Sequence, residues 1–377
     1  EVILPMTERA EQLMYIQKSF RKLAQFKSKT FDYRENSNTD YLELIPLVEG
    51  VEDQIRIGKL LSEYVDMHEK FFRRKPLYIR PFLARSDPAL LSGFIPNILA
   101  NKIALSEIHK FGKEKKVRMY PIIGAGSLVF RGGLSPARVK EFAEEYGGVR
   151  TATVQSAFRY DYPLVQVKKA LSYLNANLAK RNARTIARKD HEHLLNIIRI
   201  FSDTYRSTLD KLLQDMSPFF QAVPKRRERH QHIGLIAYKR EMGKNTLPRA
   251  ISFTAAWYSL GIPPEFIGLG RSLNSLNERE REILKKYYTH LYSDVMEAGK
   301  YINRENIKTL AKGNKSWRLI LEDIELAEKL LGIRLGPKSN RELLHHNLTS
   351  QLLLQRKNKP EVSRLIVETG KLRRSLG

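Results

Sequence analysis

The sequence predicts an α/β fold in which short buried strands alternate with amphipathic helices. Apolar runs rich in β-branched residues recur along the chain, and the first five start at intervals of roughly 35 to 40 residues, the length of a strand, a helix and two loops. Segments with helical spacing of apolar residues lie between most of these runs. The expected strands are at 1–6, 42–49, 77–87, 117–124, 151–158 and 232–240.

The first expected strand leads into an amphipathic helix over 7–26. Thr7 precedes this helix, and Glu8 and Glu11 stand in its opening turn. A threonine at this place suits an N-cap, and acidic residues in the first turn suit the helix dipole. The second expected strand is followed in the same way by a helix over 51–72.

The later part of the chain is predominantly helical. A helical stretch at about 163–223 separates the fifth expected strand from the sixth, and the chain beyond Gly270 has helical spacing almost throughout. We therefore expect a strand-and-helix domain over 1–270 with a helical insertion at about 163–223. A C-terminal helical region over 271–377 is expected to pack on it.

Strands that alternate with helices pair in parallel through crossovers. Two architectures have this rhythm, an open doubly wound sheet and a closed barrel, and the pattern alone leaves both open. In both, ligands bind at the C-terminal ends of the strands.

Composition bounds the class of protein. The 377 residues are 42% hydrophobic and 28% charged, as in ordinary globular proteins. Cysteine is absent, which excludes disulfides, zinc-thiolate sites and cysteine catalysis and suits a cytoplasmic location. No apolar run reaches the roughly 18 residues that a membrane span needs, so no membrane partner is expected.

The net charge of +25 raises nucleic acid as a partner. The densest basic cluster is at 224–232, and the tail at 356–374 is also basic. Neither interleaves aromatic residues as a base-stacking surface does. Because the charge is spread along the chain, a basic solvated surface or a small anionic substrate is favoured over a nucleic-acid-binding scaffold.

Charged or amide side chains follow each expected strand after the first. They are Glu49, Arg85 with Ser86 and Asp87, Arg131 in a glycine loop, Gln155 with Arg159 and Asp161, and Lys239 with Arg240. In a parallel sheet these strand ends share one rim, so we expect two carboxylates and several guanidinium groups to converge on one pocket.

The residue types indicate the chemistry of this rim. Two carboxylates without histidine or cysteine suit a hard divalent cation, Mg²⁺ or Mn²⁺, that keeps coordination positions open for substrate. Arginine binds carboxylate and phosphate bidentately. The pattern predicts a metal-assisted reaction on a small phosphorylated carboxylate. Asp87 precedes Pro88, so a helix N-cap is the alternative interpretation of that carboxylate.

The glycine loop at 121–133 reads PIIGAGSLVFRGG. It lacks the Lys-Ser/Thr pair of a Walker motif, which argues against nucleotide binding. We expect it to be both a turn and an anion cradle, in which Gly124 and Gly126 permit the bend and Arg131 carries the charge.

Five motifs in order resemble the archaeal-type phosphoenolpyruvate carboxylases, a family distinct from the larger bacterial and plant enzymes. The motifs are IPLVEG, ARSDPA, GAGSLVFRGGLSP, TVQSAFRYDYP and LPRAISFTAAWYSLGIPPE. The resemblance covers the chain from Glu1 to about Gly270 and implies a barrel of the phosphoenolpyruvate/pyruvate type and a homotetramer. It also implies conversion of phosphoenolpyruvate and bicarbonate to oxaloacetate and phosphate.

The resemblance also implies roles for individual residues. Glu49 and Asp87 match the carboxylates that hold the metal. Catalytic roles are expected for Arg131, Arg159 and Arg249. Substrate contacts are expected from Gly124, Gly126, Ser127, Arg131, Gln155, Arg240 and Arg85.

The chain departs from the family at one motif and one loop position. A histidine in a QHPDN-like N-terminal motif does not occur here, and we expect that the chain is a fragment lacking it and is inactive alone. Ala125 stands where the larger enzymes have a second arginine. A related metal-dependent lyase or aldolase that forms a pyruvate enolate remains the alternative enzyme class.

Overall fold

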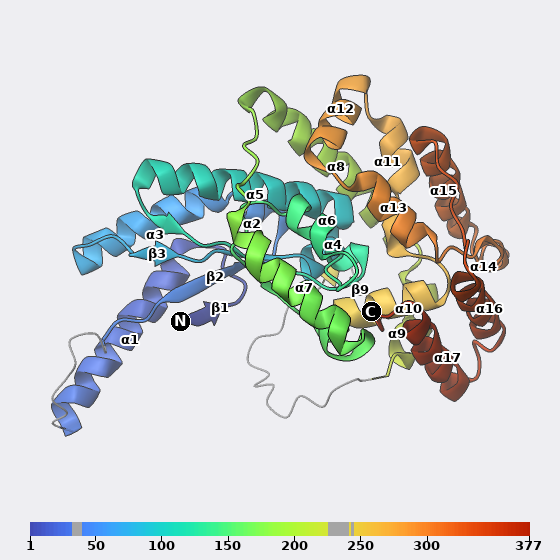
Figure 1. Cartoon of the computed structure of the whole chain (residues 1–377), viewed down its shortest axis with the longest axis horizontal. Helices are drawn as coiled ribbons and strands as arrows, with labels where there is room; N and C mark the ends of the chain where they lie inside the picture. Colours follow the sequence, from blue (N-terminus) through green and yellow to red (C-terminus); the bar gives the residue numbers. More distant parts are fainter. Residues whose placement is uncertain (32–39, 225–240, 243–244) are drawn as a thin grey trace.

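The computed structural model describes residues 1–31, 40–224, 241–242 and 245–377. The strand expected at 232–240 and the basic cluster after Pro224 therefore lie outside the described residues. Figure 1 shows a sheet with covering helices on one side of the molecule and an all-helical region on the other.

The central sheet confirms the α/β prediction. Its five strands are all parallel, and each is close to an expected position. They are β1 (Val2–Leu4), β2 (Leu44–Val48), β4 (Phe82–Ala84), β6 (Ile122–Gly124) and β7 (Thr151–Thr153). The strand order β1-β2-β4-β6-β7 follows the chain, so each new strand adds to the same edge.

This strand order bears on the two architectures that the sequence left open. A doubly wound sheet reverses direction at a switch point, whereas a barrel wall adds strands in one direction. The observed order has no such reversal. Closure is not seen: within the described ranges β1 and β7 are not paired with each other, and the sheet is open.

Two of the expected strands are interrupted by proline. Pro81 separates β3 (Tyr78–Ile79) from β4, and Pro121 separates β5 (Arg118–Met119) from β6. Proline has no backbone N–H to donate to the ladder. Among the residues that the structure describes, β3 and β5 therefore pair only with each other, as a separate two-stranded parallel sheet.

A first apolar core joins the sheet to its covering helices. These helices are α1 (Ala10–Phe31), α3 (Ile57–Phe72), α5 (Phe94–Lys115), α6 (Val139–Glu145) and α7 (Leu164–Asn177). Leu83 and Ile123 of the strands are fully buried in this core. Burial of such side chains is the main favourable contribution to the folded state.

The N-cap expected at Thr7 is wrong. Helix α1 begins at Ala10, and the Thr7 hydroxyl donates to the Leu4 carbonyl instead of accepting from the helix. The Gln12 side-chain oxygen accepts the N–H groups of Glu8 and Arg9, at 2.9 and 3.0 Å. A glutamine inside the helix thus satisfies the N–H groups that precede it.

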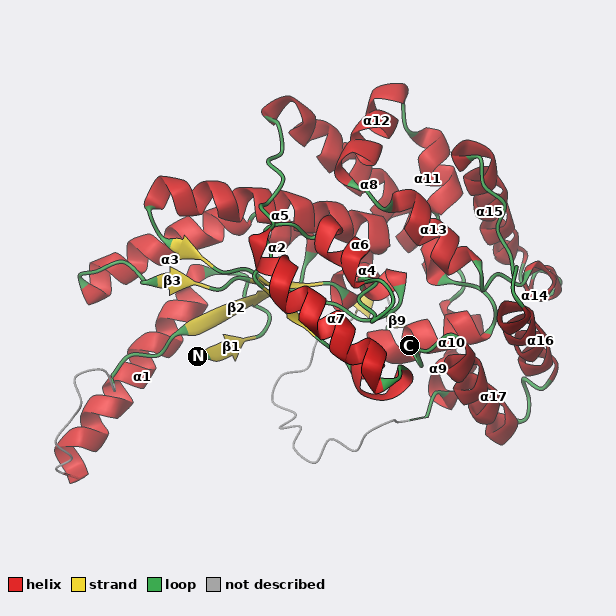
Figure 2. Cartoon of the chain, in the orientation of Figure 1, coloured by secondary structure: helices red, strands yellow, loops and turns green. Residues whose placement is uncertain are grey.

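The helical stretches expected at 163–223 and after residue 270 are present (Figure 2). A second apolar core joins helices from both. Helix α7 packs in the first core, and α10 (Ala250–Ser259), which lies between the two stretches, packs in the second. The other helices of the second core include α8 (Arg188–Asp210), α9 (Leu213–Ala222), α11 (Leu269–Ser275), α12 (Glu278–Tyr287), α13 (Leu291–Gly299), α14 (Arg304–Leu310), α15 (Arg318–Leu331), α16 (Asn340–Leu354) and α17 (Lys359–Leu372). A short antiparallel pair, β8 (Glu241–Met242) and β9 (Asn245–Thr246), precedes α10.

Helix α5 belongs to both cores. Its first half, including Ile95, Ile98 and Leu99, packs in the second core, and its second half, including Leu105 and Ile108, packs in the first. The two halves of the molecule thus share one buried element.

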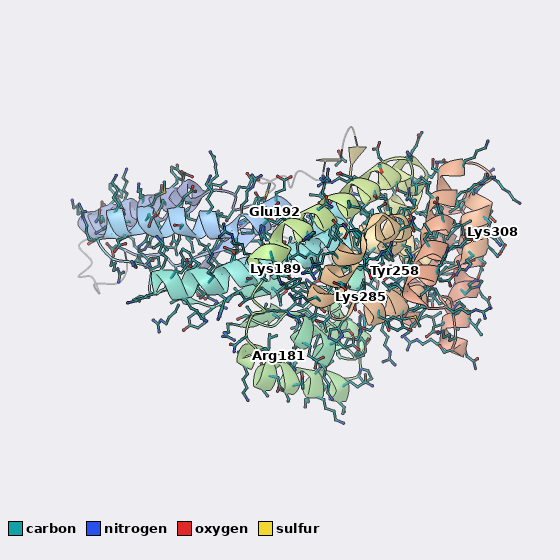
Figure 3. The ribbon with its side chains drawn as sticks, turned by 90° about the horizontal axis from the view of Figure 1, so that it is seen from above. Arg181, Lys189, Glu192, Tyr258, Lys285 and Lys308 are labelled. Atoms are coloured by element: carbon teal, nitrogen blue, oxygen red, sulfur yellow. The ribbon has the colours of Figure 1, made fainter. Side chains whose placement is uncertain are left out.

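Charge is distributed over the molecule. The labelled basic side chains Arg181, Lys189 and Lys308 come from separate elements and lie over different parts of it (Figure 3). In the part of the chain that the structure describes, no helix is long and apolar enough to cross a bilayer.

Candidate active site

The C-terminal ends of β2, β4, β6 and β7 lie along one edge of the sheet. The strands are parallel and paired in register, with Val48 opposite Leu83, Ala84 opposite Gly124, and Gly124 opposite Thr153. The residues that follow these ends are therefore neighbours. We call Glu49, Asp87, Arg131 and Gln155 the strand-end site.

Arg131 is the best-connected member of this site. Its Nη2 donates to Gln155 Oε1 at 2.8 Å and its Nε to Ser86 Oγ at 3.1 Å, and its Nη1 donates to the backbone oxygen of Gly377. The side chain is only 5% exposed. Burial lowers the pKa of Arg131 to about 10, and the nearby Asp87 carboxylate opposes that shift. The guanidinium group remains positively charged at neutral pH.

The two carboxylates come from adjacent strands. The Glu49 carboxylate accepts the Met6 N–H at 3.0 Å and follows directly after β2. Asp87 lies in the first turn of α4 (Ser86–Ser92), whose N-cap is Arg85. Asp87 is therefore not the N-cap, and the alternative interpretation of this residue is wrong.

The glycine loop has a different geometry from the one expected. Gly132 and Gly133 have φ of 119° and 73°, in the region that favours glycine, whereas Gly124 and Gly126 do not. Gly126 is needed for space: a Cβ there would lie 2.9 Å from Arg131 Cζ. Gly124 is similarly crowded, by the ring of Phe82. These two glycines permit close approach, and the bend is made later.

Sequence reasoning missed two anchors of this loop. Glu265, which is 1% exposed, accepts the Phe130 N–H at 2.8 Å and the Tyr258 hydroxyl at 2.5 Å. Ser127 Oγ donates to Ser375 Oγ at 2.8 Å. Glu265 closes the quoted GIPPE segment, where only its charge marked it. Residues 375–377 carry no motif that could have indicated their place beside Arg131.

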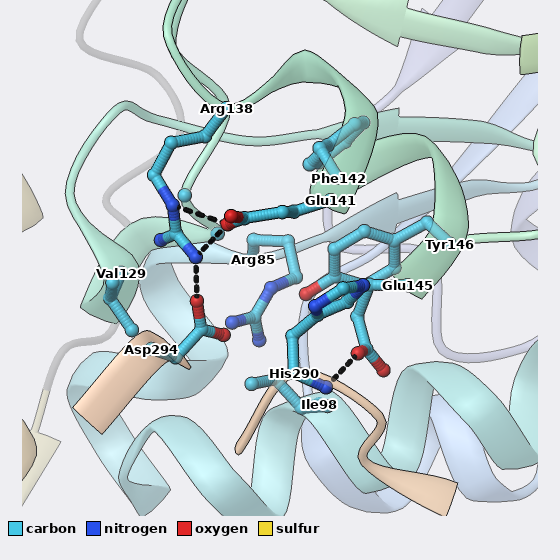
Figure 4. Close-up of a pocket in the computed structure, with 12 residues that line it drawn as sticks. Arg85, Ile98, Val129, Arg138, Glu141, Phe142, Glu145, Tyr146, His290 and Asp294 are labelled. Atoms are coloured by element: carbon cyan, nitrogen blue, oxygen red, sulfur yellow. Dashed lines mark hydrogen bonds and ion pairs between the residues drawn. The ribbon is translucent and has the colours of Figure 1, made fainter. Parts of the chain in front are cut away.

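Arg85 makes a different set of contacts from Arg131. It is fully buried and its Nη1 donates to Asn97 Oδ1. Figure 4 shows its guanidinium in a pocket, facing Tyr146 and the ion pair of Arg138 with Asp294. The pocket lining includes Arg85 and Arg138 together with the carboxylates Glu141, Glu145 and Asp294, so Arg85 belongs to an internal polar network.

The remaining expected residues are at the periphery or undescribed. Arg159 is exposed and its guanidinium lies 5.2 Å from the centre of the Tyr160 ring. Arg249 is exposed at the N-cap of α10. Arg240 lies outside the described residues.

The donor set at the strand ends fits a hard cation. Its candidate ligands are carboxylate oxygens, which Mg²⁺ and Mn²⁺ prefer. Among residues 1–31, 40–224, 241–242 and 245–377, no group of three His, Cys, Asp or Glu side chains is placed to hold a metal. A cation held by Glu49 and Asp87 would thus depend on water or substrate for its other ligands, as Mg²⁺ commonly does.

Comparison with known proteins agrees with the resemblance seen in the motifs. The chain matches the phosphoenolpyruvate carboxylase family over residues 1–377. It is 42% identical over 353 residues to a phosphoenolpyruvate carboxylase of Oenococcus oeni, covering 94% of this chain and 69% of the relative. For that of Leuconostoc mesenteroides the identity is 40%, covering 100% and 75%. The archaeal enzyme of Caldivirga maquilingensis is 36% identical, covering 100% and 75%. The chain therefore belongs to the phosphoenolpyruvate carboxylases, a family of carboxy-lyases.

Proposed function

We propose that the strand-end site carboxylates phosphoenolpyruvate with bicarbonate, giving oxaloacetate and phosphate. The observation that carries this proposal is the buried, charged Arg131 beside Asp87 and Gln155, at the edge where Glu49 also emerges. A phosphate group with a neighbouring carboxylate is the kind of ligand that such a guanidinium recognises.

Glu49 and Asp87 would hold the divalent cation, Mg²⁺ or Mn²⁺. When bound, the cation supplies positive charge that stabilises an enolate oxygen. The two carboxylates keep this charge at the strand ends, beside the glycine loop.

Arg131 would bind the transferring phosphoryl group. A bicarbonate oxygen attacks phosphorus and the bond from phosphorus to the enolate oxygen breaks, leaving carboxyphosphate and pyruvate enolate. Carboxyphosphate then releases carbon dioxide and phosphate, and the enolate carbon forms a bond to the carbon dioxide. Arg131 is preorganised for the charge that moves between these groups, because Ser86, Gln155 and Gly377 fix its position.

Secondary contacts are proposed for the residues around Arg131. Gly124, Gly126 and Ser127 would contact substrate from the glycine loop, where Gly126 packs against the Arg131 side chain. Arg159 and Arg249, both exposed, would reach substrate from the rim. The roles of Arg240 and Arg85 stay predictions, and the buried position of Arg85 favours an indirect role.

We also infer the larger context from the family. The one-directional strand order supports a barrel of the phosphoenolpyruvate/pyruvate type. A homotetramer, a cytoplasmic location and a domain boundary near residue 270 remain predictions on the same basis.

The test is oxaloacetate formation by the complete protein, coupled to malate dehydrogenase, with Mg²⁺ or Mn²⁺. Asp87→Asn is expected to cut turnover by about a thousandfold or more, since it removes a carboxylate that the metal needs. Asp66→Asn is the matched control, because Asp66 is a well-exposed carboxylate paired with Lys115. Its turnover should stay normal.

Two results would contradict the proposal. Normal turnover and metal affinity in Asp87→Asn would show that the site is assigned to the wrong residues. Product formation that does not depend on bicarbonate would favour a lyase or aldolase that shares the enolate chemistry.

A further inference from the structure

A fully buried glutamine joins the ends of the two strands that carry the carboxylates. Gln54 lies on α2 (Val51–Ile55), and its side-chain Nε2 donates to two backbone carbonyls. One is Val48 O at 3.2 Å and the other is Ala84 O at 2.9 Å. Val48 and Ala84 are the last residues of β2 and β4.

These carbonyls lie where the sheet ladder stops. The last backbone pair between β2 and β4 joins Val48, the last residue of β2, to Leu83, one residue before the end of β4. A side-chain amide has two N–H donors, and Gln54 directs one to each strand. It therefore continues the connection between β2 and β4 beyond the last backbone pair.

The other end of the Gln54 amide is fixed by α5. Its Oε1 accepts from Asn101 Nδ2 at 2.8 Å and from Asn97 Nδ2 at 3.1 Å. Both asparagines are fully buried. Because both donors and the acceptor of Gln54 are engaged, the amide cannot rotate without losing several hydrogen bonds in a dry environment.

The next residues along the two strands are the candidate metal ligands. Glu49 follows Val48 directly, and Asp87 follows Ala84 by three residues. We propose that Gln54 is a positioning residue that sets the spacing between Glu49 and Asp87, so that both carboxylates reach one divalent cation. This inference rests on the proposed function, because it takes these carboxylates as the metal ligands.

The chain contains a matched glutamine at the opposite end of β2. Gln17 on α1 is 1% exposed, donates to Leu42 O at 2.9 Å and accepts from the Tyr64 hydroxyl at 3.2 Å. It thus makes the same kind of bond near the N-terminal end of β2, whereas Glu49 follows the C-terminal end of that strand. Loss of either glutamine removes buried hydrogen bonds, but only Gln54 lies beside the proposed ligands.

The experiment measures Mn²⁺ binding to the complete protein without substrate, by the electron paramagnetic resonance signal of free Mn²⁺. Methionine replaces each glutamine with a side chain of similar shape. Gln54→Met is expected to weaken Mn²⁺ binding about 10- to 100-fold, as loss of groups that orient metal ligands does. Gln17→Met is expected to lower the melting temperature and change the Mn²⁺ dissociation constant by less than about twofold, since it leaves those groups in place.

Equal Mn²⁺ affinity in the two variants would overturn the inference, whether both are normal or both are weakened. Asp87→Asn in the same titration distinguishes failure of the metal site from failure of the positioning role alone. If it loses affinity and Gln54→Met does not, only the positioning role fails. If it keeps affinity, the metal site and the positioning role fail together.

A second variant covers the case in which Gln54→Met does not fold. Asn101→Ala removes one donor to Gln54 Oε1 and leaves both strand carbonyls bonded. A severalfold loss of Mn²⁺ affinity at normal melting temperature would support the proposal. Unchanged affinity in a folded Asn101→Ala protein would contradict it.

Discussion

Arg131 and Arg373 are two buried arginines on either side of the segment 375–377, and their surroundings differ. Each is 5% exposed, and burial lowers the pKa of each to about 10. Arg131 lies at the strand ends near Asp87. The described hydrogen-bond partners of Arg373 are neutral: His345 Nε2 at 3.2 Å, Ser259 Oγ at 3.1 Å, Leu376 O at 2.7 Å and Ala255 O at 3.5 Å. The carboxylate whose charge acts on Arg373 is Asp161.

The comparison shows that burial and a shifted pKa do not by themselves mark a functional arginine. His345, beside Arg373, has its pKa lowered well below the usual value by burial and by the arginine charge. The Arg373 region is thus a packed structural network. Arg131 differs from Arg373 in its place in the fold: it lies with Asp87 at the C-terminal edge of the parallel sheet, where ligands bind.

The largest effect is expected from exchanging each arginine for methionine. Arg131→Met should lower turnover about 100- to 1000-fold, because it removes a preorganised cation from the transferring group. Arg373→Met should change turnover by less than about tenfold, or about 1.4 kcal/mol in activation free energy. Steady-state kinetics and thermal melting of both variants measure the contrast.

Similar turnover in the two variants would erase the distinction between the regions. A large loss of turnover in Arg373→Met alone would move the catalytic role to the network around Ser259 and His345.

A smaller effect is expected at Gly126. The added methyl group of Gly126→Ala would meet the Arg131 side chain, with Cζ at 2.9 Å and Cβ at 3.0 Å, and displace it. We expect about a tenfold loss of turnover, since small displacements of a catalytic group are costly. Gly313→Ala is the control, because its nearest neighbour is Leu310 O at 3.7 Å.

If Gly126→Ala and Gly313→Ala have the same kinetics, the loop tolerates the added methyl group. Contact with Gly126 would then not fix the position of Arg131.

The smallest effect on turnover, less than about twofold, is expected from Glu265→Gln, which keeps the acceptor for Phe130 and Tyr258. Burial raises the pKa of Glu265 from 4.5 to about 7, and the Tyr258 bond only partly opposes this. The neutral carboxyl is favoured in the folded state. Its stabilising contribution is therefore complete below about pH 4.5 and lost as pH rises through about 7.

This shift corresponds to a change in unfolding free energy on the order of 3 kcal/mol across that pH range. Thermal melting from pH 4.5 to 8 should show a slope that Glu265→Gln removes. An unchanged slope in the variant would assign the pH dependence to other groups.

Periodicity and residue types predicted much of this molecule. The spacing of apolar runs predicted the five parallel strands, and the charged residues after them predicted which edge would carry Glu49, Asp87 and Arg131. These features are local. A strand is indicated by the apolar residues within its own segment, and parallel pairing then brings the C-terminal ends of the strands to one edge.

The missed features depend on contacts between distant segments. Gln54 and Glu265 act through backbone groups of other elements, which no motif around them encodes. Pro81 and Pro121 are visible in the sequence. The separate β3–β5 sheet forms because the two prolines lie side by side on neighbouring strands, which the sequence does not show. The bend at Gly132 and Gly133 was assigned to the wrong glycines, because residue type alone does not give φ.

Helix α5 has a consequence for how the molecule melts. Its Ile98 packs with the helical part and its Ile108 with the sheet, so neither half can lose structure while this helix stays fully covered. Separating the halves would expose one flank of a 22-residue element that is buried along most of its length. The protein should consequently unfold as one cooperative unit. Proteolysis that separates the sheet from the helical part would leave a fragment with an exposed apolar surface that is prone to aggregate.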